Sequence, residues 1–546
     1  MNARSVCQGC LVGTLVALAS SFGLGKALFA QPAPTDAEQE VLTRGPVHEA
    51  FAETVTYDPE PGIVSPKAPP EPIEEIPPEQ RLEGPNVAWI PGYWAWDDER
   101  SDFLWVSGIW RALPPGRQWV PGYWGKCEEG FQWTSGYWAD AQDGEVEYLP
   151  EPPDSVEIGP NVAAPSPDDI WLPGNWVWHN SRYAWRPGYW APVQPNWVWI
   201  PAHYVWTPGG YVFVGGYWDY AVGRRGVLFA PVYFAGGVYA RPGFLYSPSI
   251  VIDPGIFASH LFWRPRYRHY YFGDYYAVSY HSAGYLPWFA INTGRFGYDP
   301  IFAHDCWLHR ADRDWAHHQQ VAFELRRDHE DARPPRTWAI QRTLDVHEAP
   351  GGGRGLPIAL SLDELRKGKD SPLQFKPLDL SERKQFGQHG LEMQKFREER
   401  QKLEVKTGTI PSQSQIKALT TSKVKLPKTS IVAKSVTELG KDHAPPTTFQ
   451  APKLDLKIEP KARVKQTVEP SLQRNVNPQV LDLQKTQKQL PPKTERMLPQ
   501  SSVKDPAGLK LDQFQKKDQI KDQTKIKTID KTKDKDKSRD KDKNKK

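Results

Sequence analysis

An aromatic hexamer with a central glycine, W-x-x-G-x-W, recurs between residues 89 and 218 and limits what this chain can fold into. First positions lie 14 residues apart, apart from one gap of 16 and one of 38. A fixed period indicates a tandem-repeat architecture in which each copy is one structural unit. The six full copies are Trp89–Trp94, Trp105–Trp110, Trp119–Trp124, Trp133–Trp138, Trp171–Trp176 and Trp185–Trp190, and two degenerate copies cover 199–204 and 213–218.

Polar or Pro/Gly-rich residues separate the hexamers, so each unit predicts one strand and one turn. We expect a mainly β fold, with an antiparallel meander of about eight repeat strands. The strands would form two four-stranded groups in a sandwich, or one closed or curled sheet. The composition agrees, because 23 Trp, 22 Tyr and 21 Phe against 3 Met favour β structure over helix bundles.

The glycine inside each hexamer needs a physical reason, because glycine weakens a strand and marks a bulge or a close backbone approach. Proline often precedes it and cannot donate to a strand ladder. We therefore expect a bend or bulge at each Pro-Gly or Ser-Gly. The alternative is a hairpin turn within one hexamer, which L-Pro-Gly disfavours. The structural glycines are Gly92, Gly108, Gly122, Gly136, Gly174 and Gly188.

The repeat aromatics allow two interpretations. Because side chains alternate along a strand, Trp94 and Trp96 share a face, as do Trp176 and Trp178. These rings either pack the core of a thin sheet or form exposed ladders that bind a ligand. Under the second interpretation the ligand-binding residues are Trp94, Trp96, Trp124, Trp176, Trp178, Trp190 and Trp206.

The ends of the chain differ from the repeat in composition. Residues 1–30 resemble a signal peptide, with Arg4 before an apolar run over 11–24 and small residues at Ala27 and Ala30. The run is too short and interrupted to predict a membrane span. We expect its removal, which leaves no transmembrane domain, although retention as an anchor is the alternative. The Pro/Glu-rich residues 31–84 predict a disordered spacer.

Three further regions follow. The repeat β domain spans 85–226, with an insertion at 140–169. Residues 227–345 are rich in aromatics, His and Arg and are expected to end in a helix over 305–330. Residues 346–546 predict a disordered Lys/Gln/Pro-rich tail, with one helix over 380–405 and a capping box at Ser361 and Glu364.

Metal and disulfide chemistry find little support. Signal removal would leave only Cys127 and Cys306, which allow one disulfide at most. The cluster of His304, Cys306 and His309, followed by His317 and His318, matches no zinc spacing. A surface helix with polar histidines is the better interpretation, and we expect no metal and no cofactor.

Catalytic signatures are also missing from the sequence. A glycosidase needs a pair of carboxylates, and Asp97, Asp98, Glu128 and Glu129 supply candidates. They lie in expected turns, where solvated Asp and Glu are common. The sequence therefore predicts a protein that is not an enzyme.

The hexamers resemble the bacterial W-x-x-G-x-W repeat family of exported proteins, also written Y-x-W-G-x-W. The resemblance covers residues 89–218, about a quarter of the chain, with Ala202 in place of Gly and Phe213 in place of Trp. It implies a cell-envelope location, and the family has no established biochemical activity.

Three functions are compatible with these features. The first is an exported structural or adhesive protein of the periplasm, cell envelope or extracellular space, with other envelope proteins as partners. The second is a glycan-binding module that stacks aromatic rings on envelope polysaccharide. The third is binding of an anionic polymer or membrane by residues 501–546, which carry a net charge of +7. The rest of the chain has a net charge of −3, so no specific nucleic-acid binding is expected.

Overall fold

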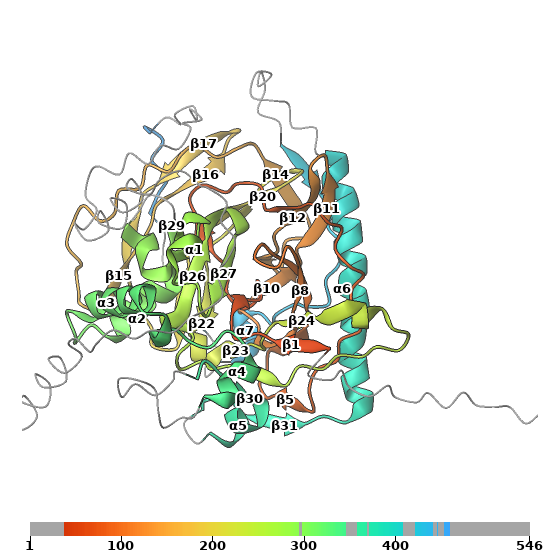
Figure 1. Ribbon diagram of the computed structural model, residues 1–546. Helices are drawn as coiled ribbons and strands as arrows, with labels where there is room; N and C mark the ends of the chain where they lie inside the picture. The colour runs from red at the N-terminus through yellow and green to blue at the C-terminus, as the bar shows by residue number, and fades with distance from the viewer. Residues whose placement is uncertain are drawn as a thin grey trace, which may run out of the picture.

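The computed structural model describes residues 38–293, 297–344, 357–368, 371–407, 421–440, 445 and 452–458 (Figure 1). In these ranges antiparallel strands in many small sheets predominate, which confirms the predicted mainly β class. The predicted signal segment 1–30 and the basic segment 501–546 lie outside the described residues. Among the helices of the described ranges, none combines the length and the apolar character that a membrane crossing needs.

The eight repeats pair two by two into four hairpins. Hairpin A (residues 87–112) consists of β6 (Val87–Ile90), β7 (Tyr93–Asp97), β8 (Asp102–Val106) and β9 (Ile109–Ala112). Hairpin B (117–140) consists of β10 (Arg117–Val120), β11 (Tyr123–Cys127), β12 (Gly130–Thr134) and β13 (Tyr137–Asp140). Hairpin C (169–192) consists of β15 (Asp169–Leu172), β16 (Asn175–His179), β17 (Arg182–Arg186) and β18 (Tyr189–Pro192). Hairpin D (197–220) consists of β19 (Trp197–Ile200), β20 (His203–Thr207), β21 (Gly210–Val214) and β22 (Tyr217–Tyr220).

Both long strands of each hairpin are interrupted at the middle of the hexamer. In hairpin A the outer halves β6 and β9 pair, as do the inner halves β7 and β8. Trp89 lies opposite Trp110, and Trp94 opposite Trp105. The expected bend at Pro-Gly or Ser-Gly is therefore confirmed. The alternative of a hairpin turn there is wrong, because aromatics pair between hexamers and not within one.

The strand order differs from a continuous meander. Tight turns close each hairpin between its two inner strands, and in hairpin C this turn places Asn180 and Ser181 at positive φ. In the described sheets, no strand of one hairpin pairs with a strand of another. Instead β9 pairs with β23 (Gly226–Val227) and β8 with β24 (Val232–Phe234). The structural unit is thus two hexamers.

Residues 38–84, predicted to be a disordered spacer, pack against the rest of the fold. They form β1 (Gln39–Val41), β2 (Gly45–Pro46), β3 (Val55–Thr56), β4 (Val64–Ser65) and β5 (Gln80–Leu82). Each pairs with a strand from a distant part of the chain, for example β4 with β12 and β1 with β24. The prediction failed because it judged the segment by its average composition. Its few apolar side chains, such as Phe51 and Val55, are buried in the core, and backbone pairing and buried carboxylates hold the rest.

The insertion and the region after the repeats complete the sheets. The insertion supplies β14 (Val146–Leu149), which pairs with β21. The later strands are β25 (Ile250–Ile252), β26 (Leu261–Arg264), β27 (His269–Phe272), β28 (Leu286–Pro287) and β29 (Gly297–Tyr298). The helices are α1 (Val278–Ser282), α2 (Pro300–Leu308), α3 (Trp315–Asp328) and α4 (Trp338–Thr343).

The single helix predicted over 305–330 is replaced by α2 and α3, so that boundary was wrong. Helix α2 begins earlier because the Asp299 carboxylate caps it and accepts from the backbone N–H groups of Ile301 and Phe302, both at 2.9 Å. The helix is broken between α2 and α3, where the Asp312 side chain accepts a hydrogen bond from the backbone N–H of Asp314 at 3.0 Å. Local bonding of this kind competes with helix.

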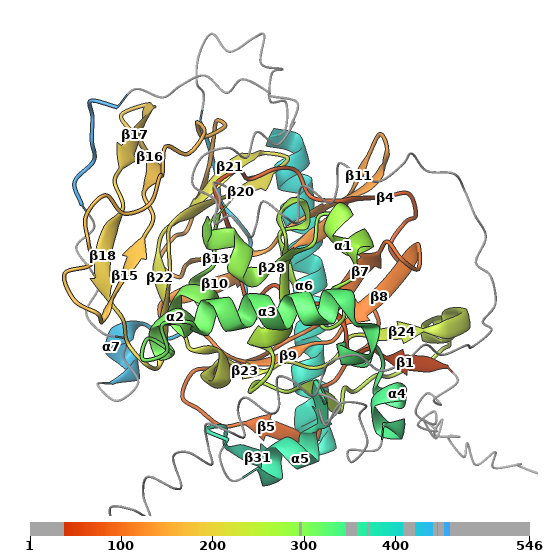
Figure 2. The ribbon, with the colours of Figure 1, turned by 60° about the vertical axis from the view of Figure 1, so that its left-hand side comes forward.

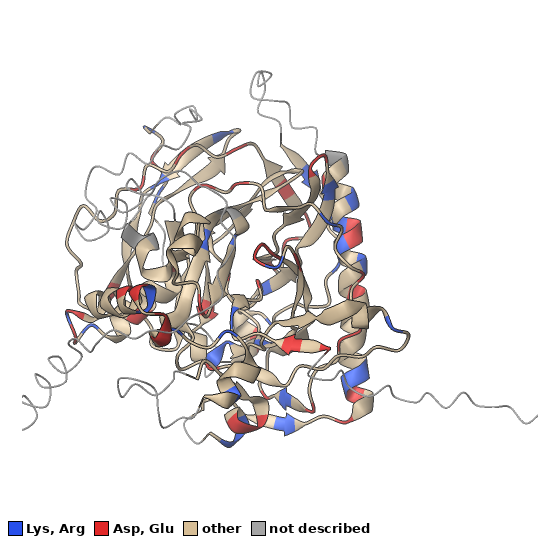
Figure 3. Cartoon of the chain, in the orientation of Figure 1, with Lys and Arg blue, Asp and Glu red and all other residues tan. Residues whose placement is uncertain are grey.

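Part of the predicted disordered tail also packs on the repeats. It contains β30 (Ala359–Ser361), α5 (Leu362–Lys367), β31 (Phe375–Pro377), α6 (Leu380–Thr407), β32 (Ser422–Val424) and α7 (Val436–Leu439). The capping box of Ser361 and Glu364 is confirmed at α5, and the helix expected over 380–405 corresponds to α6. Figure 3 shows charges of both signs along α6, which borders hairpins A and B.

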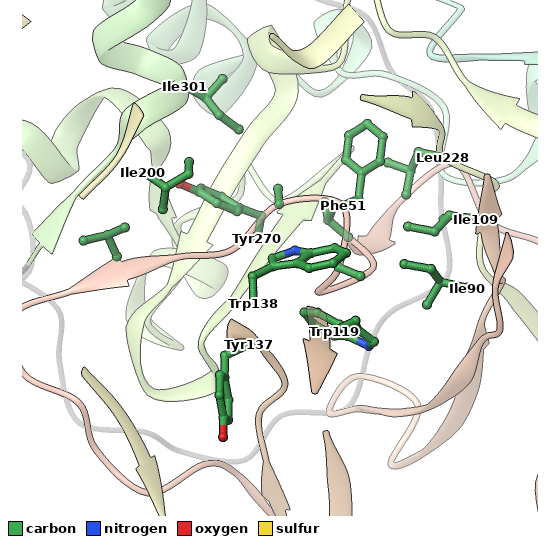
Figure 4. Packing of buried hydrophobic residues seen from close by; sticks show 14 of the residues in the cluster. Phe51, Ile90, Ile109, Trp119, Tyr137, Trp138, Ile200, Leu228, Tyr270 and Ile301 are labelled. Atoms are coloured by element: carbon green, nitrogen blue, oxygen red, sulfur yellow. The ribbon is translucent and has the colours of Figure 1, made fainter. Parts of the chain in front are cut away.

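Hairpins A, B and D share one large core with the segment 38–84 and the region after the repeats. Figure 4 shows Trp119 and Trp138 of hairpin B beside Phe51, with Ile200 of hairpin D and Tyr270 nearby. Hairpin C belongs to a separate, smaller cluster with part of hairpin D, built around Trp176, Trp185 and Tyr204. In Figures 1 and 2, hairpin C lies at the edge of the molecule away from α6.

Candidate functional site

The bend of hairpin A binds a carboxylate that comes from outside the repeat. Glu75 accepts hydrogen bonds from the backbone N–H groups of both hexamer glycines, Gly92 at 2.8 Å and Gly108 at 2.9 Å. The indole Nε1 of Trp105 donates a third, at 3.2 Å. Hydrogen bonds to an ionised carboxylate are roughly twice as strong as neutral ones. We call this arrangement, a hexamer glycine N–H and a first-position indole N–H on one carboxylate, a carboxylate clasp.

Hairpins B and C contain the same clasp. In hairpin B, Glu49 accepts from Trp133 Nε1 at 2.9 Å and from the Gly136 N–H at 3.0 Å. In hairpin C, Glu157 accepts from Trp171 Nε1 at 3.2 Å and from the Gly174 N–H. Each carboxylate comes from a segment outside the hexamers. The repeat is therefore built to hold a foreign glutamate at its bend.

The hexamer glycine is needed because an indole lies directly on it. A Cβ atom built on Gly108 would lie 2.5 Å from Cζ2 of Trp89, and one built on Gly188 would lie 2.5 Å from Cζ2 of Trp171. The relation is reciprocal, since the first Trp of each repeat covers the glycine of its partner. The same close approach, below 3.0 Å, holds for Gly92, Gly122, Gly136 and Gly174. None of these six glycines has a positive φ, so space and not backbone conformation requires glycine.

Hairpin D departs from the hexamer at two positions, Ala202 and Phe213. Phe213 pairs with Tyr204 in the register that Trp105 and Trp94 occupy in hairpin A, so Phe213 corresponds to the Trp that covers a glycine. The residue that corresponds to the covered glycine, Gly92 of hairpin A, is Ala202. A smaller ring thus accompanies the added methyl group. The bend still holds a carboxylate, because Glu53 contacts His203 Nε2 at 2.9 Å and accepts from the Tyr217 hydroxyl at 2.8 Å.

Hairpins A and C hold their glutamate segments by similar hydrogen bonds, with a register that differs by one residue before the glutamate. The last Trp of the first hexamer donates to a carbonyl four residues before the glutamate in hairpin A, Trp94 to Glu71 O at 2.9 Å, and three residues before it in hairpin C, Trp176 to Asp154 O at 3.0 Å. The last Trp of the second hexamer donates to the carbonyl five residues after it: Trp110 to Gln80 O at 2.9 Å, and Trp190 to Val162 O at 3.1 Å. Each hairpin therefore grips an extended peptide at three points.

The seven tryptophans predicted to bind a ligand do not form one exposed ladder. Trp94, Trp96 and Trp176 are buried, and Trp124, Trp178, Trp190 and Trp206 are half-buried. Four of their indole N–H groups donate to carbonyls of the chain itself: those of Trp94, Trp124, Trp176 and Trp190. Trp178 lines a cavity of about 540 Å³ with Phe213 and the lysines 423, 425 and 428.

Helix α6 contacts the bends of hairpins A and B from outside. Arg400 donates to Pro121 O at 2.7 Å and Ser135 O at 3.2 Å, while its Nε bonds Glu404 at 2.8 Å. The Glu404 carboxylate in turn accepts from the Tyr123 hydroxyl at 2.7 Å. Both charged side chains are fully buried. The helix thus satisfies carbonyl groups that the bend leaves without strand partners.

Burial changes the protonation of the clasp in hairpin A. It raises the pKa of Glu75 from 4.5 to about 7, although the N–H groups of Gly108, Gly92 and Trp105 act in the opposite direction. The folded protein therefore keeps a proton on Glu75 between about pH 4.5 and 7 that the unfolded chain releases. Its contribution to stability is complete below about pH 4.5 and is lost as the pH rises to about 7.

We expect this effect to appear in a comparison with Glu75→Gln, which cannot titrate. Lowering the pH from 8 to 4.5 should raise the free energy of unfolding of the natural chain relative to the variant by about 3 kcal/mol. Urea unfolding at several pH values measures it, and other titrating groups cancel in the difference. Glu79→Gln, at an 80% exposed side chain, serves as the control and should give a profile parallel to the natural one. If the free energy of unfolding of Glu75→Gln changed with pH in parallel with that of the natural chain, the raised pKa of Glu75 would be contradicted.

The other predicted chemical groups lie apart from the clasps. His309 stacks on Trp315 with ring centroids 4.6 Å apart, and His304 Nε2 contacts Gln194 O at 3.1 Å. Cys127 and Cys306 are free thiols. In the part of the chain that the structure describes, no three His, Cys, Asp or Glu side chains are placed to share a metal.

The predicted turn carboxylates have two different environments. Glu128 and Glu129 are exposed, as expected for solvated turns. Asp97 is buried, with Oδ2 3.9 Å from Arg44 and 3.7 Å from Arg100, and Asp98 pairs with Arg264 at 2.7 Å. For Asp97 the expectation of a solvated charge was wrong, because the segment 38–84 brings Arg44 to the turn of hairpin A.

Comparison with known families identifies the repeat. A sequence model of the WXXGXW repeat, two copies long, matches residues 84–111, 170–191 and 195–219. The chain carries the WXXGXW repeat. These matches correspond to hairpins A, C and D, and hairpin B has the same structure. Neither the curated proteins nor the solved structures contain a match to the chain.

The clasp glutamates are functional residues that the sequence analysis missed. Glu75 and Glu157 each stand 17 residues before the first glycine of their hairpin. Both are followed by isoleucine and, within three residues, by proline. This shared spacing was a usable signal. No comparable spacing points to Glu49 or Glu53, which lie 87 residues from Gly136 and 164 residues from Tyr217.

Proposed function

We propose that this protein is a non-enzymatic structural or adhesive protein of the bacterial cell envelope, and that its WXXGXW hairpins act as clasps for extended, glutamate-bearing segments. The observation that carries the proposal is the filling of all four hairpin bends by a carboxylate from outside the hexamers. Three of these carboxylates are buried, so they serve to join segments of chain and not to meet a substrate.

The three clasps and the buried carboxylate of hairpin D explain how a chain rich in Pro and Gly holds together. Hairpins A to D are not joined to one another by strand pairing, so other contacts must connect them. Glu49 and Glu53 lie four residues apart and reach hairpins B and D respectively. One short segment therefore ties two hairpins together. A scaffold assembled in this way suits a load-bearing role in the envelope, with envelope proteins or polysaccharide as partners.

Export is the part of the proposal that fractionation tests. Cells expressing the full chain with a C-terminal epitope tag should contain it in the envelope or periplasmic fraction, with an N-terminus near residue 31. The signal-defective variant Leu15→Arg with Leu18→Arg should stay in the cytoplasm, because charge in the apolar segment blocks export. An intact N-terminus on soluble cytoplasmic protein would overturn the proposal.

A second candidate function is glycan binding in the cavity between hairpins B, C and D. Its lining combines Trp178 and Phe213 with the carboxylates of Asp140 and Asp143, and aromatic rings with nearby polar groups suit sugar recognition. The full chain should be retained on polysaccharide or peptidoglycan, and Trp178→Ala should abolish the retention. Trp206→Ala, outside this cavity, is the matched control. Equal retention of both variants would exclude the cavity as a glycan site.

A further inference from the structure

Hairpin C differs from the other hairpins in the exposure of the segment that it holds. Ile76, directly after the glutamate of hairpin A, is only 2% exposed, and α6 covers it at Gly387. Ile158, at the same position in hairpin C, is 83% exposed, and Val162 is 62% exposed. In hairpin C the residues from Ile158 to Val162 are therefore held mainly by hydrogen bonds, whereas Val156, before the glutamate, packs against the cluster around Trp176.

The glutamate that a hairpin holds need not lie near that hairpin in the sequence. Hairpin B binds Glu49, which lies 87 residues before Gly136, and hairpin D binds Glu53, which lies 150 residues before His203. Because so many residues separate these carboxylates from their hairpins, a glutamate of a separate chain could bind in the same way. The hydrogen bonds common to hairpins A and C involve one glutamate and two backbone carbonyls, and every extended peptide offers such carbonyls.

We propose that hairpin C is a binding site for an extended acidic peptide of another chain, which replaces residues 151–162. The ligand has a glutamate on Trp171 and Gly174, a carbonyl three residues earlier on Trp176 and a carbonyl five residues later on Trp190. Proline near the glutamate suits the site, because it keeps the peptide extended. The proposal rests on the clasp function proposed above.

The peptide has two sources of the same chemistry. A second copy of this chain offers residues 151–162 with an identical sequence, so exchange between copies conserves every contact. A different envelope protein with a glutamate in an extended Pro-containing segment offers the same groups. Either peptide would link one molecule to another by hydrogen bonds at hairpin C, which lies at the edge of the fold in Figure 2.

The test uses a fluorescent peptide of residues 151–162 and the full chain. Glu157→Ala weakens the hold on the internal segment, so this variant should bind the peptide at least about tenfold more tightly than the natural chain. A peptide with Gln in place of its glutamate should lose about tenfold in affinity. Adding Trp171→Phe to Glu157→Ala removes the indole donor and should weaken binding several-fold, whereas Trp206→Phe in the same background should not.

Fluorescence anisotropy gives the affinities, and circular dichroism verifies folding. If Glu157→Ala does not fold, Glu157→Gln replaces it, because Gln keeps the shape of the side chain. Equal binding of the Glu and Gln peptides, or no effect of Trp171→Phe, would overturn the proposal. Sedimentation then distinguishes the two sources of the peptide. If the natural chain self-associates and Trp171→Phe abolishes this, the ligand is a second copy of the chain. If the natural chain is a monomer that still binds the peptide, the ligand is another protein. Neither result depends on where the protein resides in the cell.

Discussion

Replacing Gly108 by alanine is expected to lower the free energy of unfolding by about 3 kcal/mol. The added Cβ would lie 2.5 Å from Cζ2 of Trp89 and 2.9 Å from both Ile90 O and an oxygen of Glu75. Trp89 is fully buried, so its indole has no free space to move into. Urea or thermal unfolding measures the change. Gly223→Ala is the matched control, because a Cβ there meets nothing within 4 Å.

A double variant tests whether the indole causes the effect. Trp89→Phe in the Gly108→Ala background reproduces the pair found naturally at Phe213 and Ala202. In the described part of the chain Trp89 Nε1 has no hydrogen-bond partner, so phenylalanine removes no hydrogen bond. The double variant should be more stable than the sum of the single losses predicts, by at least about 1 kcal/mol. Strict additivity would show that the glycine is needed for another reason.

Removing the Asp219 carboxylate is expected to have an effect at least as large. Arg111 donates to both oxygens of Asp219 at 2.7 Å, and Arg225 Nε lies 3.1 Å from one of them. Their side chains are 3% exposed or less. Asp219→Asn would leave two buried guanidinium groups without a counter-charge, and breaking such a pair costs about 3–5 kcal/mol. The cluster joins hairpins A and D, so both should unfold more readily.

The control is an ion pair of the same chemistry at the surface. Asp363, whose side chain is 56% exposed on helix α5, pairs with Arg366 at 2.7 Å and with Lys367. Asp363→Asn should leave the unfolding midpoint unchanged, because solvent screens exposed pairs. A similar loss in both variants would mean that burial does not govern these pairs.

The sequence was sufficient to predict the local structure of the repeat. The positions of Pro and Gly predicted the bend, and the polar residues between hexamers predicted turns, such as the one at 179–182 that closes hairpin C. Both predictions rest on local backbone properties, which short sequence patterns record. The sequence did not predict that hexamers pair two by two. In a continuous meander each strand pairs with the next, and in separate hairpins only every second pair of neighbours does so, but the spacing of 14 residues is the same in both arrangements.

The clasps were missed for a different reason. Composition predicted that the Pro/Glu-rich segment 31–84 would be disordered, since it has few apolar side chains to bury. The structure holds residues 38–84 by burying these few apolar side chains, such as Phe51, and through groups that composition does not weigh, such as the Glu49 carboxylate and the backbone strand β4. From sequence alone, a charged residue is predicted to be solvated unless its partner is known. For Glu49 and Glu53 that partner lies far along the chain.

The pairing of hexamers has a consequence for how such arrays can grow. A single inserted hexamer would provide one bent strand with no opposite strand, and its first Trp would have no glycine to cover. The smallest duplication that preserves the contacts is therefore a whole hairpin of two hexamers. Each new hairpin also needs one more carboxylate from elsewhere in the chain or from a neighbouring molecule. Related arrays should accordingly contain even numbers of hexamers, and lengthening one part of the gene would require an acidic residue in another.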